Sequence, residues 1–77
     1  MINIDKVDKK LGESQMKCER RITLRQLAAD AGITPHTLSA IRVGRTRGSY
    51  ITAQKLARAF REYGVPCAVD SLLQDAA

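Results

Sequence analysis

The chain is short of the residues that build metal centres and disulfide frameworks. Its 77 residues contain two cysteines, Cys18 and Cys67, and one histidine, His36. The cysteines lie 49 positions apart and form no Cys-x-x-Cys pair, so a zinc site lacks ligands. A disulfide between them is geometrically possible, but two isolated cysteines in a chain without a secretion signal are more typical of small buried side chains. We therefore expect reduced thiols and no metal.

Membrane and export signals are also missing. No apolar run approaches the roughly 20 residues that a membrane-spanning helix needs, and residues 1–6 lack the basic-then-apolar order of a secretion signal. These absences predict a cytoplasmic protein with no membrane partner. A length of 77 residues supports one hydrophobic core, and 44% apolar with 27% charged residues is ordinary globular usage. We expect one folded domain over residues 1–77, which excludes a multidomain enzyme.

Acidic residues are absent from the middle of the chain. The net charge is +5, but residues 34–61 hold six basic and no acidic side chains, whereas residues 62–77 hold three acidic and no basic ones. A stretch of 28 positions without an acid is a candidate phosphate-binding face. A small soluble protein can also be basic for solubility alone, and charge does not decide between these two interpretations.

Apolar residues recur at helical spacing almost throughout, which predicts an all-α fold. A first helix face is formed by residues three or four positions apart from Ile4 to Cys18. The sequence Thr-x-x-Gln at residues 23–26 is a capping box that starts a second helix at Leu24. Gly32 ends that helix, because glycine adopts the left-handed conformation that a tight turn demands.

Three more helices are expected after this turn. Thr34 followed by Pro35 is a helix start, and this third helix runs to about residue 43, where Gly44 closes it. A fourth helix follows a cap at Ser49 and ends near residue 64. Pro66 is expected to open a short fifth helix. The predicted architecture is therefore a small five-helix bundle.

Residues 24–43, LRQLAADAGITPHTLSAIRV, place two short helices around a glycine, which is a helix-turn-helix pattern. Such a pair needs apolar side chains at the helix contact, a small residue where the helices cross, and glycine at the turn. The chain supplies these at Leu27, Ala28, Ala31, Gly32, Ile33, Leu38 and Ile41. An ordinary helical hairpin of another bundle is the alternative.

The same stretch resembles a known family, the Cro and phage-repressor-like, or Xre-like, helix-turn-helix domains. The resemblance runs from Ile22 to Leu73 and is carried by ITLRQLA, by AGIT at the turn, by TLSAI and GR, and by TAQKLARAF. It implies a lambda-repressor-like domain that binds double-stranded DNA as a homodimer on a two-fold symmetric operator and acts as a transcriptional regulator, such as a repressor. The chain departs from the family at Leu24, where many members have glutamine, at Val43, where many have asparagine, and at Arg42, which is often glutamate.

In such domains the second helix of the motif enters the major groove of DNA. Leu38 and Ile41 must face the core, so the opposite side of the helix faces outward. By family position and by this geometry, the expected base-contacting residues are Pro35, His36, Thr37 and Ala40. None is a strong bidentate reader, so thymine-methyl contacts and DNA shape are expected to contribute to selectivity. For His36, an exposed side chain without a role is the alternative.

Contacts to the DNA backbone are expected from two kinds of residue. The threonines cap helices whose N-terminal amides suit phosphate oxygens, and the arginines follow the reading helix in a glycine-flanked loop. The expected residues are Thr23, Thr34, Arg45 and Arg47. A solvated basic loop is the alternative for the two arginines. The basic face of the fourth helix, with Lys55, Arg58 and Arg61, is left out of this site, since it lies behind the reading helix.

Two expectations concern contacts outside the motif. Arg42 is expected to form an ion pair with an acid of the first helix, such as Glu13 or Glu19. A small core and one short reading helix favour a dimer. Self-association is expected through the apolar residues of the last helix and its approach, with two N-terminal residues as the alternative: Val65, Val69, Leu72 and Leu73, or Ile2 and Ile4.

The sequence therefore favours a sequence-specific DNA-binding regulator. A protein-interaction module on the same fold, such as the antitoxin of a toxin–antitoxin pair, is the alternative. An enzyme is not expected, because no nucleophile–base set, metal-ligand spacing or phosphate loop is present. No cofactor and no small-molecule substrate are expected.

Overall fold

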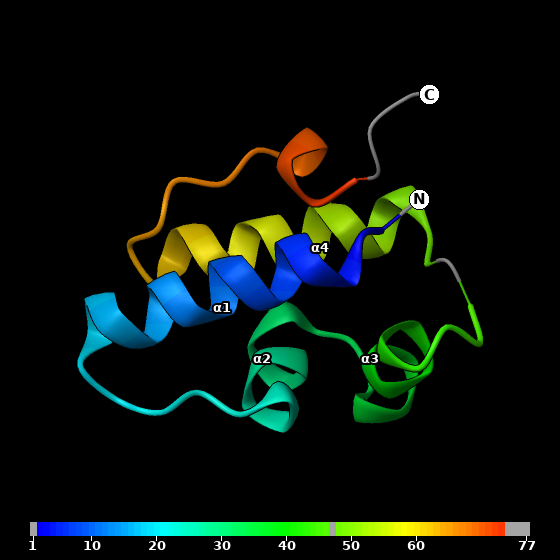
Figure 1. Cartoon of the computed structure of the whole chain (residues 1–77), viewed down its shortest axis with the longest axis horizontal. Helices are drawn as coiled ribbons and strands as arrows, with labels where there is room; N and C mark the ends of the chain where they lie inside the picture. Colours follow the sequence, from blue (N-terminus) through cyan, green and yellow to red (C-terminus); the bar gives the residue numbers. More distant parts are fainter. Residues whose placement is uncertain (1, 47, 74–77) are drawn as a thin grey trace.

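The computed structural model describes residues 2–46 and 48–73. It contains four α-helices and one 3-10 turn: α1 (Ile4–Cys18), α2 (Leu24–Ala31), α3 (Pro35–Arg42), α4 (Tyr50–Glu62) and η1 (Val69–Leu72). The helices α1 and α4 lie side by side, with α2 and α3 on one side of the pair and η1 on the other (Figure 1). The described residues form no strand of a sheet, so the expected all-α class is confirmed.

Each α-helix begins at the polar side chain that caps it. The threonine hydroxyls of Thr23 and Thr34 accept hydrogen bonds of 3.1 Å from the backbone N–H groups three residues later, as the sequence predicts. Ser49 caps α4 in the same way, and Asn3 caps α1. The expected capping box is only half formed, because the Gln26 side chain is turned to Asp30, to which its amide N–H donates (3.0 Å), and its oxygen does not accept the backbone N–H of Thr23.

Two glycines end the helices of the motif in the same way. Gly32 after α2 has φ +77°, and Gly44 after α3 has φ +81°. The following N–H group reaches back five residues in each case, from Ile33 to the carbonyl of Ala28 and from Arg45 to the carbonyl of Ala40, both at 2.9 Å. This arrangement, a Schellman motif, satisfies carbonyls at the helix end and requires a residue that tolerates positive φ.

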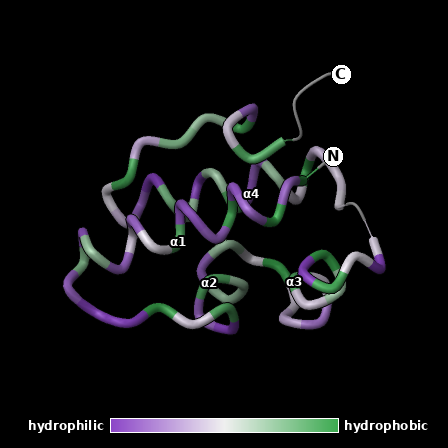
Figure 2. Tube along the Cα trace, in the orientation of Figure 1, coloured by the Kyte–Doolittle hydropathy of each residue, from purple (hydrophilic) through white to green (hydrophobic). Residues whose placement is uncertain are grey.

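The hydrophobic core lies where all four helices meet. Its fully buried large side chains include Val7, Ile22, Leu27, Leu38, Leu56, Phe60 and Leu72. Ala28 and Ala31 of α2 are also fully buried, as expected for residues at the contact between the motif's helices. Apolar positions recur along each helix, whereas the first part of the turn between α1 and α2 is hydrophilic (Figure 2). Ser14, buried among apolar residues, donates its hydroxyl to the carbonyl of Lys10 (2.9 Å).

The expectation of a fifth helix starting at Pro66 is wrong. The chain before Val69 has no regular secondary structure, and η1 is a single 3-10 turn. The carbonyl of Pro66 accepts a hydrogen bond from Lys10 Nζ, and that of Cys67 accepts one from Arg61 Nη1, both at 3.0 Å. These side chains take the place of the amides that an α-helix would supply, so the segment stays extended against α1 and α4.

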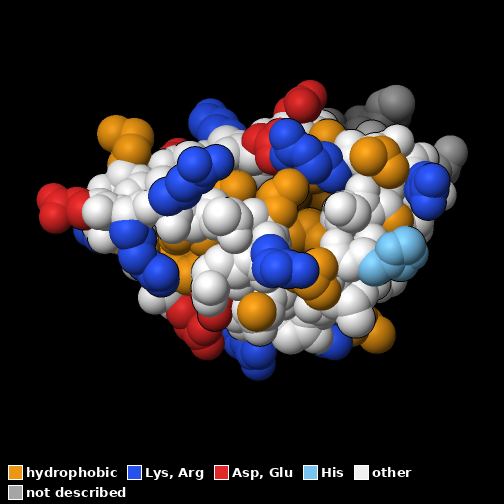
Figure 3. Space-filling model, turned by 90° about the horizontal axis from the view of Figure 1, so that it is seen from below, with side chains coloured by type: hydrophobic (Ala, Val, Ile, Leu, Met, Phe, Trp, Pro, Cys, Tyr) orange, Lys and Arg blue, Asp and Glu red, His pale blue; other side chains and the backbone are white. Residues whose placement is uncertain are grey.

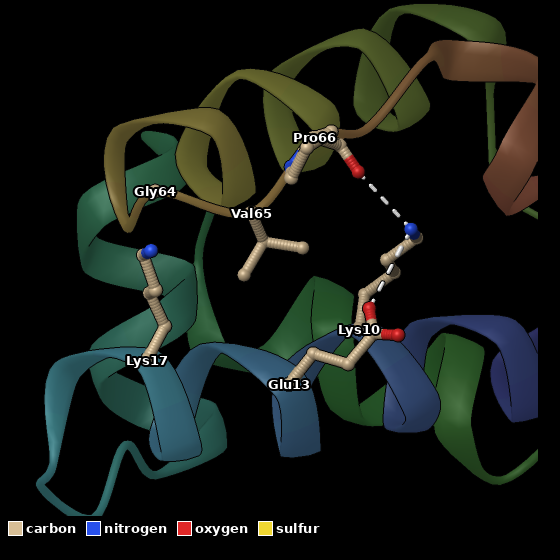
Figure 4. Close-up of a pocket in the computed structure, with 6 residues that line it drawn as sticks. All are labelled: Lys10, Glu13, Lys17, Gly64, Val65 and Pro66. Atoms are coloured by element: carbon tan, nitrogen blue, oxygen red, sulfur yellow. Dashed lines mark hydrogen bonds and ion pairs between the residues drawn. The ribbon is translucent and has the colours of Figure 1, made fainter.

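Figure 4 shows the cleft of about 350 Å³ between α1 and the turn after α4. Lys10 lies at one end, where its ammonium also pairs with Glu13 at 3.5 Å. Lys17 lies at the other end, and a Cβ built on Gly64 would lie 3.3 Å from its methylene carbons. Gly64 has φ +91°, so glycine is required here both for the turn and for this close approach.

One hydrogen bond ties α2 to the end of α4. The hydroxyl of Tyr63, which is only 9% exposed, donates to the carboxylate of Asp30, and Gln26 donates to the same carboxylate. The bond from Tyr63, followed by that from Gln26, lowers the pKa of Asp30 below its ordinary value of 3.8. Burial, together with the neighbouring carboxylate, raises the pKa of Tyr63 above its ordinary value of 10.0.

We expect Tyr63→Phe to lower the free energy of unfolding at neutral pH by about 1–2 kcal/mol, because a charge-assisted hydrogen bond is lost. The folded state lowers the pKa of Asp30, so this contribution is present above pH 3.8 and is lost as the pH falls through the folded pKa. The difference between the two proteins should therefore shrink below pH 3.8. Urea unfolding at several pH values measures it, and an equal difference at every pH would contradict this assignment.

Candidate nucleic-acid interface

The outer side of α3 carries the residues predicted to contact bases. Leu38 and Ile41 are 1% and 4% exposed and anchor the helix in the core. Pro35 and His36 are exposed and Ala40 is half-buried on the same side, whereas Thr37 is half-buried at the flank of the buried face. The structure thus brings the four together on one helix, whose first turn is free to approach a ligand.

The hydroxyl of Thr37 is held by the cap of its own helix. It lies 2.8 Å from the hydroxyl of Thr34, and either oxygen can be the donor. The Thr34 hydroxyl also accepts the backbone N–H of Thr37 at 3.1 Å. Thr37 is therefore fixed in one orientation, with one of its hydrogen-bonding positions already used. His36, in contrast, is exposed, and its side chain forms no hydrogen bond with any other described residue.

The threonines predicted to lie near phosphates, Thr23 and Thr34, are both exposed at helix N-termini. Their hydroxyls satisfy one amide each, while the earlier amides of the first turn have no partner within the helix. Unpaired amides and the positive end of the helix dipole suit a phosphate oxygen. Pro35 has no N–H, so α3 offers fewer amides than α2 does.

The loop after α3 is attached to the core at both ends. Arg45 is exposed and follows the Schellman turn directly, whereas Arg47, also predicted to contact the backbone, lies outside the described residues. At the far end, a Cβ built on Gly48 would lie 2.6 Å from Ile2 Cδ1 and 3.2 Å from Ile41 Cδ1. Gly48 therefore lies close against the core, with φ +75°, while the bond from the Arg45 N–H to the carbonyl of Ala40 holds Arg45 next to α3.

The face that carries α2 and α3 is predominantly basic. Figure 3 shows Lys and Arg side chains spread over it, the single histidine toward one end, and acidic side chains mostly toward the rim. A groove of about 460 Å³ lies between α1, the start of α2 and the end of α3. Arg21, Thr23 and Arg42 all line it. Arg21 is not among the residues predicted from the sequence, and its signal is its position two residues before the helix cap Thr23.

Arg42 pairs with an acid of α1, as expected, but the partner is neither Glu13 nor Glu19. Its guanidinium lies 2.8 Å from a carboxylate oxygen of Asp8. Glu13 pairs with Lys10, and Glu19 lies beyond the last turn of α1 in a left-handed conformation. Five residues separate positions 8 and 13, which turns the second carboxylate about 140° around the helix axis and away from α3.

We expect Arg42→Glu to lower the free energy of unfolding by about 1 kcal/mol, because it replaces a partly exposed ion pair with two like charges. The double variant Asp8→Lys with Arg42→Glu reverses the pair and should recover most of this loss. Thermal unfolding of the four proteins in the double-mutant cycle measures the coupling. Additive effects of the two substitutions would show that the pair contributes nothing.

The cysteines and the other residues able to bind a metal ion are dispersed over the described part of the chain. The described residues contain no group of three or more His, Cys, Asp or Glu side chains placed to hold a metal ion. Cys18 and Cys67 are free thiols, and burial raises the pKa of Cys67, which disfavours its reactive thiolate form. None of the helices in the described ranges is long and apolar enough to cross a membrane.

A family model described as Helix-turn-helix (HTH_3) matches residues 13–63, which span the end of α1 and all of α2, α3 and α4. The chain belongs to this helix-turn-helix family. The match confirms the resemblance drawn from the motif at residues 24–43 and makes the protein a DNA-binding transcription regulator. The helix-turn-helix family is a DNA-binding family and not an enzyme family. No curated protein and no solved structure matches the chain.

Proposed function

We propose that this protein is a transcriptional repressor that binds a two-fold symmetric operator as a homodimer, with residues 1–77 forming a single helix-turn-helix domain. The observation that supports this best is the orientation of α3. Leu38 and Ile41 are buried, and the opposite side of the helix, with His36 in its first turn, is open to a major groove.

In this proposal, side chains of α3 contact the DNA bases, and residues around α3 contact the DNA phosphates. His36 supplies a hydrogen bond to a base edge, while Pro35 and Ala40 supply apolar contact to thymine methyl groups. Thr37 lies at the flank of this surface. The backbone contacts come from the amides capped by Thr23 and Thr34 and from the exposed basic residues Arg21, Arg45 and Arg47.

The homodimer is supported by the binding free energy that DNA selectivity needs, more than by an identified surface between two copies. One short helix buries too little of the major groove for useful selectivity, and a second copy doubles the contacts. The surfaces expected for self-association offer little, because Ile2, Val65 and Leu72 are at most 6% exposed within one chain. An exposed apolar side chain that remains next to α3 is Val43 (69%), which directly follows the helix, and we place the contact between copies there.

The division of labour between bases and phosphates can be tested with two alanine variants. His36→Ala is expected to reduce discrimination among operator variants by about fivefold, close to 1 kcal/mol, and to change affinity for random DNA much less. Arg45→Ala should weaken binding to all duplexes alike and reduce the slope of log affinity against log salt by about one. Anisotropy titrations measure both, and equal behaviour of the two variants would contradict the proposal.

A further inference from the structure

The outer face of α4 is a basic surface with an exposed apolar residue in it. Ala53, Leu56 and Phe60 occupy the opposite face and are fully buried. The exposed side chains are Tyr50, Ile51, Gln54, Lys55, Arg58, Arg61 and Glu62. Five of them, Ile51, Gln54, Lys55, Arg58 and Arg61, line a shallow groove of about 320 Å³. We call these five residues the α4 groove.

The cations of the α4 groove are not neutralised by the chain itself. Lys55, Arg58 and Arg61 follow one another at intervals of three, so neighbouring like charges repel along the helix. Within the described residues, neither Lys55 nor Arg58 has a hydrogen-bond or ion-pair partner, and Arg61 is held by the carbonyl of Cys67. A ligand with carboxylates placed along the groove would relieve this repulsion.

Ile51 gives the groove an apolar anchor. Its side chain is 63% exposed and lies one turn before Lys55 and two turns before Arg58. An isoleucine exposed in this way gains free energy when it is covered by another apolar side chain. The combination of an apolar residue with cations four and seven positions later matches the spacing of an opposing amphipathic helix.

DNA and a second copy of the chain fit this groove less well. The buried side of α4 packs on α2, so the outer side faces away from the helix that presents its N-terminus to phosphates. The helices α2 and α3 lie on one side of the α1–α4 pair (Figure 1), so a duplex lying along them would not cover a face of α4 that is turned away from α2. Two copies joined by this face would set Lys55 and Arg58 of one copy against the same cations of the other, since Glu62 is the one acid among the exposed residues of α4.

We propose that the α4 groove binds an acidic amphipathic helix of a second protein, with an apolar side chain of that helix on Ile51 and its carboxylates on Lys55 and Arg58. This interaction does not rest on the proposed repressor function. It leaves the reading face of α3 open, so the protein can hold its partner and DNA at the same time.

The probe is a fluorescein-labelled 16-residue helical peptide with two leucines seven positions apart and four glutamates beside them. We expect it to bind at least about tenfold more tightly than the same peptide with glutamine at the four positions. Ile51→Ser and Arg58→Glu should each weaken binding by about tenfold, close to 1.4 kcal/mol. Lys9→Glu, an equal charge change on the exposed side of α1, should change it less than about twofold.

The same variants separate this groove from the DNA site. Protein saturated with an operator duplex should bind the peptide with unchanged affinity, and Arg58→Glu should change DNA affinity less than about threefold. The proposal is wrong if the peptide does not bind, or if Ile51→Ser and Arg58→Glu leave the affinity for the peptide unchanged. Competition between peptide and DNA, or an equal loss of both on Arg58→Glu, would overturn it as well by assigning the face to DNA.

Discussion

Replacing Phe60 with alanine is expected to lower the free energy of unfolding by about 3–5 kcal/mol, because it leaves a cavity in a packed core. The ring of Phe60 is fully buried on α4, and it packs edge-on against Tyr63 with centroids 6.5 Å apart. A core of this size supplies only about 5 kcal/mol in total, so the variant should be largely unfolded at room temperature.

The matched control is Tyr50→Ala, which removes an aromatic ring from the same helix at a side chain that is 53% exposed. It should cost less than about 1 kcal/mol, as substitutions on exposed surfaces usually do. Circular dichroism followed through a urea titration measures both variants. A loss of less than about 1 kcal/mol for Phe60→Ala would show that α4 does not organise the core.

Replacing His36 with glutamate is expected to weaken DNA binding by about 100-fold or more and to leave folding intact. A carboxylate in the major groove faces phosphates on both sides and offers no proton to a base acceptor, which together cost several kcal/mol. The same carboxylate lies in the first turn of α3, where negative charge is favourable, so the free energy of unfolding should not fall. The substitution therefore separates binding from stability.

The control for the change in net charge is Gln54→Glu, which adds the same single negative charge to the exposed side of α4. We expect this variant to change DNA affinity less than about threefold, since the new charge is screened at a distance. Anisotropy titrations with one duplex compare the two variants directly. If both lose affinity equally, the protein binds DNA through its overall charge and not through α3.

The boundaries of the motif could be predicted because their signals are local. Thr23 and Thr34 cap the helices that follow them, and Gly32 and Gly44 have the positive φ expected of residues that close a helix. Each of these signals depends on a side chain and on backbone atoms within about five residues. The spacing of the apolar residues also predicted which side of α3 is buried, and therefore that His36 lies on the exposed side.

The parts that could not be predicted depend on contacts between distant residues. Pro66 has the sequence of a helix start, but the carbonyl that would begin the helix is bound by Lys10, 56 positions away. The partner of Arg42 depends on how α1 is rotated against α3, so Asp8 could not be distinguished from Glu13 by charge alone. Val65 was expected on the surface because the fold of the last segment was unknown, and it is 6% exposed.

The candidate site also has a part that local sequence signals predict and a part that depends on contacts between distant residues. That Pro35, His36 and Ala40 lie on the side of α3 away from Leu38 and Ile41, with Thr37 at the flank, follows from helical periodicity and is found in the structure. The groove shared by Arg21 and Arg42 is formed by three helices and could not be found from spacing. The sequence places the basic face of the fourth helix behind the reading helix but does not predict the α4 groove, because the exposure of Ile51 beside the cations is visible only once the helices are packed.

The central claim is selective DNA binding through α3, and one titration tests it most directly. Anisotropy of a duplex selected from a random pool is compared with that of a scrambled duplex of equal length, across a series of salt concentrations. The account predicts that the selected duplex binds more tightly by about 10³-fold or more, and that its sequence has two-fold symmetry. Equal binding of both duplexes with a steep salt dependence, or no binding to either, would contradict it.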